Sequence, residues 1–478
     1  MDADQIRGLQ PMLSGYMGEF DDCFVRPESR THFRTYVEGQ LSDLDAKSCE
    51  PIALASGIPP RNLQAFLATC QWDEDGARER LHQIVVRDHC GPNSIGIIDE
   101  TSDVKKGNKT PGTKRQWCGT VGKTENCIVT VHLGYATGDF HCLLDGELFL
   151  PEDWAADRDR CREAGIPDDV GYRPKWRIGL DLYDRARRNG VVFDWLVYDE
   201  GYGGKPQFLR EMDARRQAFV AEVPTTFTGW IHKPRVTERP FRRARGRGRR
   251  TPRLVAGSRP AICVKNMLTY SPALRDQPWV RYHVKDGQKG PLVWEAKQTR
   301  ITIKDEQGLP GMPLHLVVAR NVLDPGELKF FVSNAPPETE VQTLLLVAFS
   351  RWRVERCFQD QKQEVGLDQW EGRRWLGLKR HLIITSVSYL FLARVREQLR
   401  EKKSGAYRVP SARRGGVVGA KLVAERPRVG AIDRAYREGD PTLATPHRRR
   451  PPEPHAKNAG KTAGNGHLPP RPHPLPMA

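Results

Sequence analysis

The sequence lacks long apolar runs and is short of acidic side chains. No stretch of its 478 residues approaches the roughly 18 to 20 uninterrupted apolar residues that a membrane-spanning helix needs, and its N-terminus has no basic-then-apolar signal. Asp and Glu number 59 against 76 Lys and Arg, a formal charge of +17. Such a surplus favours a polyanionic partner, and without a membrane segment that partner is nucleic acid. We expect a cytoplasmic location.

Paired cysteines are also lacking. The ten cysteines are scattered, with no CxxC pair and no histidine partner at zinc-finger spacing. This pattern disfavours a zinc or disulfide framework and favours reduced cysteines that act as small core residues.

The N-terminal part of the chain has helical patterning. Residues 62–89 place apolar side chains at helical spacing, with Asp73 as a plausible cap before a second helix. We expect residues 1–90 to form a helical region. It is either a module that binds DNA ends or a subdomain that only packs, because no recognition helix stands out.

Strand patterns follow in a block and then alternate with helices. Runs at 94–101, 115–122, 126–136 and 140–151 predict an antiparallel meander. The expected order continues with a helix at 174–190, a strand at 193–203, a helix from 206 and a strand at 218–224. This predicts an α/β fold, a mixed sheet covered by helices, whose first part spans 91–224.

The remaining chain divides into an insertion, a helical segment and a tail. Residues 225–338 contain the arginine run 239–253 and several strand-like segments, which predict a β-rich insertion. One long helix is expected at 339–366 and an apolar helix at 381–399, so that 339–402 completes the core. Residues 403–478 are rich in Pro, Gly, Arg and His, which predicts a basic, disordered tail.

Acidic residues at the ends of two apolar strands are candidates for catalysis. Asp99 ends IGIIDE and Asp199 ends WLVYDE, where sheet proteins commonly place chemistry. Neighbours in a strand point to opposite faces, so only one of Asp99 and Glu100, and one of Asp199 and Glu200, can face a site. Asp103 is expected in the following turn, as a cap.

A third carboxylate shares a helix face with two cations. At 100° per residue, Arg351, Glu355 and Lys362 lie within about 40° of one another. The carboxylate can bind a metal ion, while the two cations can hold the phosphates of a DNA strand across it.

Several motifs agree in order with a known family. The spacing R-x3-E-x6-K in RWRVERCFQDQK (351–362) resembles the Tyr-Arg-Glu-Lys signature of DDE-type bacterial insertion-sequence transposases. IIDETSDVKKG, RQWCGTVGK and VYDEGYG also resemble this family, and the resemblance covers roughly residues 60–400. One position departs from the signature, since its tyrosine falls on Ala348.

The resemblance implies both fold and activity. It implies an RNase H-like (retroviral-integrase-like) core in which Asp99, Asp199 and Glu355 are catalytic and hold two Mg²⁺ ions, with Mn²⁺ as a substitute. It further implies cleavage and strand transfer at the terminal inverted repeats of an insertion sequence, by a homodimer on DNA in the bacterial nucleoid. The alternative is an inactive or domesticated descendant that only binds DNA.

Basic and aromatic residues elsewhere are candidates for DNA contact. We expect phosphate contacts from the turn after Asp99 and from the arginine run, in addition to Arg351 and Lys362. Trp279 and Trp294 in the insertion are weighed as base-stacking residues against the commoner role of a strand tryptophan in the core. The phosphate-contacting side chains are Lys105, Lys106, Lys109, Lys114, Arg115, Arg243, Arg245 and Arg247.

Overall fold

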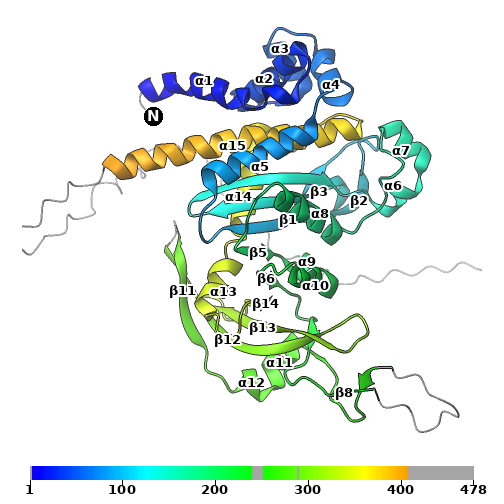
Figure 1. Ribbon diagram of the computed structural model, residues 1–478, viewed down its shortest axis with the longest axis vertical. Coiled ribbons are helices and arrows are strands. Elements are labelled where there is room, and N and C mark those ends of the chain that lie inside the picture. Colours follow the sequence, from blue (N-terminus) through cyan, green and yellow to red (C-terminus); the bar gives the residue numbers. More distant parts are fainter. Residues whose placement is uncertain (1–2, 239–250, 288–289, 407–478) are drawn as a thin grey trace, which may run out of the picture. The chain divides into compact units, whose positions relative to one another are not determined.

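A large mixed sheet forms the centre of the protein (Figure 1). The computed structural model describes residues 3–238, 251–287 and 290–406. The sheet has ten strands in the order β11-β12-β13-β14-β6-β5-β1-β3-β2, with β4 paired to β3. The predicted α/β class, a mixed sheet flanked by helices, is confirmed.

The strands that carry the candidate aspartates lie at the centre of this sheet. β1 pairs antiparallel with β3 and parallel with β5, and β5 pairs parallel with β6. The expected meander is wrong in one respect: β2 pairs with the start of β3 rather than lying between β1 and β3. The strands of this part are β1 (Ile95–Val104), β2 (Lys114–Cys118), β3 (Lys123–Thr137), β4 (Phe140–Leu148), β5 (Trp195–Tyr198) and β6 (Phe219–Glu222).

Helices join these strands much as the sequence predicts. α8 (Lys175–Arg188) has Pro174 as its N-cap and Asn189 as its C-cap, so its predicted ends are confirmed. The other helices between β4 and β6 are α6 (Glu152–Ala156), α7 (Arg158–Ala164), α9 (Glu200–Gly203) and α10 (Pro206–Ala214).

The insertion continues the central sheet. β14 pairs antiparallel with β6, and β13, β12 and β11 follow outward in turn. The insertion also contains two short helices, which the sequence analysis did not anticipate. Its elements are β7 (Thr228–Gly229), β8 (Val236–Thr237), β9 (Arg253–Leu254), β10 (Ile262–Cys263), α11 (Val264–Tyr270), α12 (Pro272–Arg275), β11 (Val280–Gly287), β12 (Gly290–Lys304), β13 (Pro310–Asn321) and β14 (Leu328–Ser333).

The helix expected at 339–366 is two helices. α13 (Val341–Ala348) ends at Phe349, and α14 (Trp352–Val365) begins after Arg351. The Ser350 hydroxyl donates to the Leu346 carbonyl at 2.7 Å, a side-chain bond of the kind that competes with helix continuation. α14 ends at Gly366, whose φ of 74° favours glycine.

The N-terminal helices pack on the last described helix, α15 (Trp375–Ala406). Tyr16 donates to the Val387 carbonyl at 2.8 Å, and Tyr36 bonds His381 at 3.0 Å; all of these groups are buried. The N-terminal helices are α1 (Ala3–Gly18), η1 (Asp21–Cys23), α2 (Pro27–Leu41), α3 (Cys49–Ala55), α4 (Pro60–Ala68) and α5 (Glu74–His89). α15 runs four residues past the boundary expected at 402.

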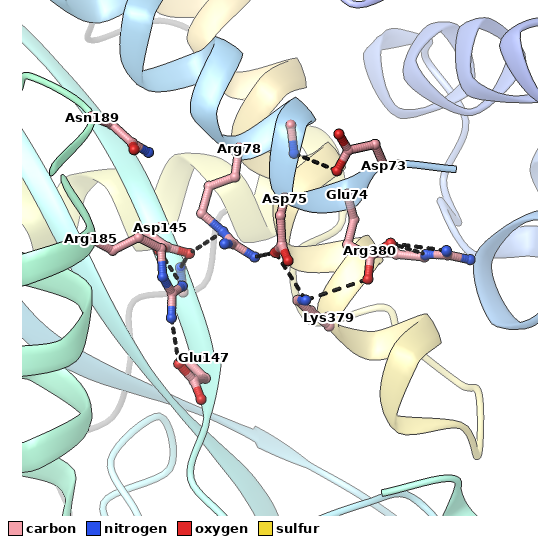
Figure 2. Close-up of polar contacts among 12 residues, drawn as sticks. Asp73, Glu74, Asp75, Arg78, Asp145, Glu147, Arg185, Asn189, Lys379 and Arg380 are labelled. Carbon is pink, nitrogen blue, oxygen red and sulfur yellow. Dashed lines mark hydrogen bonds and ion pairs between the residues drawn. The ribbon is translucent and has the colours of Figure 1, made fainter. Parts of the chain in front are cut away.

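Charged side chains also join α5 to the sheet and to α15 (Figure 2). Arg78 on α5 pairs with Asp145 on β4 at 3.2 Å, and Asp145 also pairs with Arg185 on α8 at 2.7 Å. Glu74 on α5 pairs with Arg380 on α15 at 3.0 Å. The N-terminal helices are therefore tied to the core by ion pairs as well as by apolar packing.

The described residues contain neither a membrane-spanning helix nor a disulfide. Among the described residues, no helix is long and apolar enough to cross a membrane. The ten cysteines are all free, and none forms a disulfide. Residues 407–478 of the expected tail and the arginines at 243, 245 and 247 lie outside the described residues, whereas residues 403–406 belong to α15.

Candidate active site

Asp99 is a buried carboxylate in β1, with 6% of its surface exposed. One carboxylate oxygen accepts the Glu100 backbone N–H at 2.8 Å, and the other accepts Arg351 Nη1 at 2.7 Å. Burial raises the pKa of Asp99 to about 7; the Arg351 guanidinium opposes this rise and the Asp199 carboxylate adds to it. Asp99 thus lies where a further positive charge would be stabilising.

Asp199 lies beside Asp99 at the same end of the sheet. Ile98 on β1 pairs with Tyr198 on parallel β5, so the two aspartates directly follow paired residues. Asp199 is also the N-cap of α9, and its carboxylate accepts the Gly201 N–H at 2.9 Å. Gly203 permits this turn, because a Cβ there would overlap the Glu222 carbonyl of β6.

α14 brings its three charged groups toward β1. Arg351 bridges two carboxylates, since its Nη2 lies 2.8 Å from Glu355 Oε1 while its Nη1 bonds Asp99. Lys362 donates to the Ser102 carbonyl at 3.0 Å and to the Thr120 hydroxyl at 2.9 Å. Glu355 keeps 58% of its side chain exposed, so it can turn toward a ligand.

The other acidic residues near the two aspartates have different surroundings. Glu100 pairs with Lys175 on α8 at 2.5 Å, on the face of β1 opposite to Asp99. Glu200 is exposed in the first turn of α9. The expectation for Asp103 is wrong: it lies within β1, because the strand continues to Val104, and it pairs with Lys105 rather than capping a turn.

The donor chemistry fits a divalent cation, although the carboxylates are not gathered into a ready-made cluster. Among the described residues, no three His, Cys, Asp or Glu side chains are already placed to hold a metal ion. Carboxylate oxygens are nonetheless the ligands that hard cations prefer. Arg351 bonds one oxygen of Asp99 and one oxygen of Glu355, and it supplies the positive charge between these two carboxylates.

The basic loop after β1 is partly occupied by internal contacts. Lys105 donates to the Trp370 carbonyl at 2.6 Å, and Lys114 pairs with Asp153 at 3.0 Å. Lys109 pairs with Glu163 at 2.7 Å. Lys106 and Arg115 are exposed. The loop therefore presents charge at its surface, while Lys105 fastens it to the segment after α14.

The two insertion tryptophans weighed for base stacking differ in their burial. Trp294 is 4% exposed and packs on Phe349 with ring centroids 4.7 Å apart. The guanidinium of Arg320 lies 4.2 Å from the ring centroid of Trp279. In the described part of the chain, the tryptophans with the largest exposure are Trp117 and Trp352, at 61% and 44%. The core role weighed for Trp294 is confirmed.

Sequence reasoning missed a fourth carboxylate near the site. Glu222 ends β6, the parallel neighbour of β5, and its charge raises the pKa of Arg351 together with Asp99, Glu355 and Asp199. Glu222 also pairs with Lys329 at 2.7 Å. The position of an acid at the end of a third apolar strand was the signal that would have found it.

The fold and the site together indicate the class of protein. Adjacent strand-end aspartates and a helix-borne glutamate, two of them bonded by one arginine, are typical of metal-dependent enzymes that cut phosphodiester bonds. A family model described as DDE superfamily endonuclease matches residues 19–291, more than half of the chain. The chain therefore belongs to the DDE superfamily endonucleases, which generally use divalent metal ions and act on nucleic acid.

Two individual proteins are similar to this chain. The probable transposase for insertion sequence element IS701 of Microchaete diplosiphon is 34% identical over 212 residues, 44% of this chain and 52% of that protein. The match thus spans about half the length of this relative. The NurA nuclease from Sulfolobus solfataricus matches 60% of this chain and 90% of its own at 11% identity, but a TM-score of 0.22 supports no argument.

Proposed function

We propose that this chain is the transposase of an insertion sequence, which cuts DNA at the element's terminal inverted repeats and joins the ends to target DNA. The observation that carries the proposal is that Arg351 binds both Asp99 and Glu355, while Asp199 follows the strand that pairs with the strand of Asp99. Family membership and the IS701 relative support it. Two ends must be handled together, so a homodimer on DNA belongs to the proposal.

The three carboxylates are proposed to hold two Mg²⁺ ions, for which Mn²⁺ substitutes. When bound, the ions would activate water or a 3′-hydroxyl and steady the leaving oxygen. Arg351, once released from Asp99, is placed to bind a phosphate beside the carboxylates, because a guanidinium suits two phosphate oxygens at once. Lys362 holds the strand about three helical turns beyond Arg351 along α14.

We propose roles for the core, the insertion and the N-terminal helices. Residues 91–224 and 339–402 form the catalytic core, and 225–338 form the insertion. The N-terminal residues 1–90 are proposed to pack against α15 as their main role and to bind DNA ends only through surfaces that α15 leaves exposed. The buried hydrogen bonds between these residues and α15 support the packing role.

The test is cleavage of DNA that carries the inverted repeats flanking the gene, with Mg²⁺ or Mn²⁺ added. Asp99→Asn, Asp199→Asn and Glu355→Gln are expected to abolish cutting while DNA binding persists. Glu100→Gln and Glu364→Gln are matched controls, because Glu100 faces α8 and Glu364 is exposed on α14. Both controls are expected to cut.

Two outcomes would contradict parts of the proposal. A wild-type protein that binds the ends but never cuts them is an inactive or domesticated DNA-binding descendant. Variants of the three carboxylates that cut as well as wild type would show that the assigned residues are wrong, even if the chain is a transposase.

A further inference from the structure

A hollow outside the carboxylate site is lined by three arginines. Its volume is about 550 Å³, and it lies between the loop after β1, the α6–α7 segment and the residues that precede α15. Arg160, Arg373 and Arg374 line it, with Trp154 as its apolar wall. We refer to these four residues as the arginine hollow.

Two of the three arginines are held in place by backbone carbonyls, and none of the three is neutralised by an ion pair in the described part of the chain. Arg160 donates to the Asn108 carbonyl at 2.8 Å and lies 3.6 Å from the ring centroid of Trp154. Arg374 donates to the Glu163 carbonyl at 3.2 Å, and Arg373 is exposed. Within residues 3–238, 251–287 and 290–406, no carboxylate forms an ion pair with Arg160, Arg373 or Arg374. Carbonyls orient a guanidinium but leave its charge free for an anion.

The acidic residues of the hollow already have partners. Asp157 caps α7 by accepting the Arg160 backbone N–H at 3.0 Å. Asp159 pairs with Arg162, and Glu163 pairs with Lys109 at 2.7 Å. The carboxylates are thus balanced by a helix end and by two further cations. The arginines of the hollow give it a net positive charge.

A chain of contacts leads from the candidate active site to the hollow. Lys362 bonds the Ser102 carbonyl, three residues or roughly 10 Å along β1 from Asp99. Lys105 then bonds the Trp370 carbonyl, and Thr110 donates to the Gly372 carbonyl at 3.3 Å. The next residues after Gly372 are the two arginines of the hollow. The hollow is therefore linked to β1 and to Lys362 through the loop that follows β1.

We propose that the arginine hollow binds phosphates of the same DNA strand or duplex whose cleaved bond lies at Asp99. The inference rests on the proposed function, because it takes the partner to be the DNA that the carboxylates cut. Planar guanidinium groups match phosphate oxygens, and an exposed hollow lined by arginines suits a backbone better than a base edge. The hollow thus sets affinity and register, and it carries no sequence preference.

The test measures the affinity of the full chain for inverted-repeat DNA by fluorescence anisotropy, without divalent ions so that no cutting occurs. Arg373→Ala with Arg374→Ala is the main variant, since both side chains are exposed. Each lost phosphate contact is expected to weaken binding about eightfold at 0.1 M salt and to lower the salt slope by about 0.9. Arg160→Lys keeps the charge but not the stacking on Trp154, and a smaller loss is expected.

The matched control removes an arginine from another surface. Arg188 is exposed in the last turn of α8, and Arg188→Ala is expected to leave affinity within about twofold. If the double variant and Arg188→Ala bind DNA equally while wild type still binds and cuts, the hollow proposal is overturned and the proposed function stands. If wild type neither binds nor cuts this DNA, both proposals fail. Equal melting temperatures show that the variants are folded.

Discussion

At the scale of single residues, Arg351 is the group on which the candidate site depends. It is an internal cation for Asp99, which is buried, and for Glu355, which is exposed. Without it, Asp99 would be a buried carboxylate whose charge is opposed only by one backbone N–H. The residue proposed to bind phosphate therefore also stabilises the protein in the absence of DNA.

This double role predicts a measurable coupling. Arg351→Ala is expected to lower the free energy of unfolding by about 2 kcal/mol, because it leaves the Asp99 carboxylate buried and unpaired. In an Asp99→Asn background the same change is expected to cost about half as much. Urea unfolding of the four proteins measures the difference. Strictly additive losses would show that the two side chains do not stabilise each other.

Much of the site was predictable at this scale, and its connections were not. Apolar runs with acidic ends indicated the pairs Asp99/Glu100 and Asp199/Glu200, strand alternation allowed one of each pair to face a site, and the family resemblance selected the aspartates. The bond between Arg351 and Asp99 joins residues 252 positions apart, and no local pattern encodes it. The arginine hollow was missed for the same reason, since three separate segments supply its lining.

At the scale of elements, the end of a helix was predicted correctly where a side chain caps it. The Asp73 carboxylate accepts the Gly76 N–H at 2.8 Å and caps α5, as its position before the helix predicts. The break between α13 and α14 was not foreseen, because Phe349 and Ser350 interrupt neither the apolar spacing nor the helix propensity strongly. Tertiary contacts of Arg351 with β1 accompany that break.

The cap supplies a prediction for α5. Asp73→Ala is expected to lower the free energy of unfolding by about 1 kcal/mol, because one N–H at the start of the helix loses its partner. Asp73→Asn, which retains an acceptor oxygen, is expected to lose less than half of that. Equal losses for the two variants in thermal unfolding would argue against the cap.

The ion pairs of Asp145 supply a second prediction at this scale. Its side chain is 1% exposed and lies between Arg78 and Arg185 (Figure 2). Asp145→Asn is expected to cost about 3 kcal/mol, because two largely buried guanidinium groups lose their shared carboxylate.

An exposed ion pair is the control for this variant. Asp168 pairs with Arg158 but is 78% exposed, so Asp168→Asn is expected to cost less than about 1 kcal/mol. If the two aspartate variants unfold at the same urea concentration, the buried network contributes no more than a surface pair.

At the scale of the whole molecule, buried histidines predict how stability depends on pH. Burial lowers the pKa of His82, His132 and His381 to about 4. An unfolded histidine takes up a proton near pH 6.5, whereas these three stay neutral in the folded state. Their contribution is therefore present above pH 6.5 and is lost progressively as the pH falls toward 4.

The expected loss is large enough to measure. Each of the three groups contributes up to about 3 kcal/mol over this range, since one pKa unit corresponds to 1.36 kcal/mol. Urea unfolding between pH 8 and 4 should show a steep decline below pH 6.5. His381→Asn is expected to reduce the steepness, whereas a change at the exposed His232 is the control. A pH-independent midpoint would contradict the prediction.

The overall class was predictable, and the joining of its parts was not. Alternating strands and helices predict a mixed sheet, and the β-rich character of 225–338 is evident from its composition. The pairing of β14 with β6 makes the insertion part of that sheet, and no periodicity in either strand identifies the partner. Strand pairing between distant segments is decided by packing over the whole sheet.

The shared sheet has a consequence for how the insertion can be altered. Removing residues 225–338 would strip β6 of its neighbour and leave the N–H and C=O groups of that strand without partners, an edge that invites aggregation. A shortened insertion would have to retain β14 as a protective strand. The insertion therefore cannot be exchanged as an independent unit. Engineered versions should shorten it from β11, the strand farthest from β6, by removing one hairpin at a time.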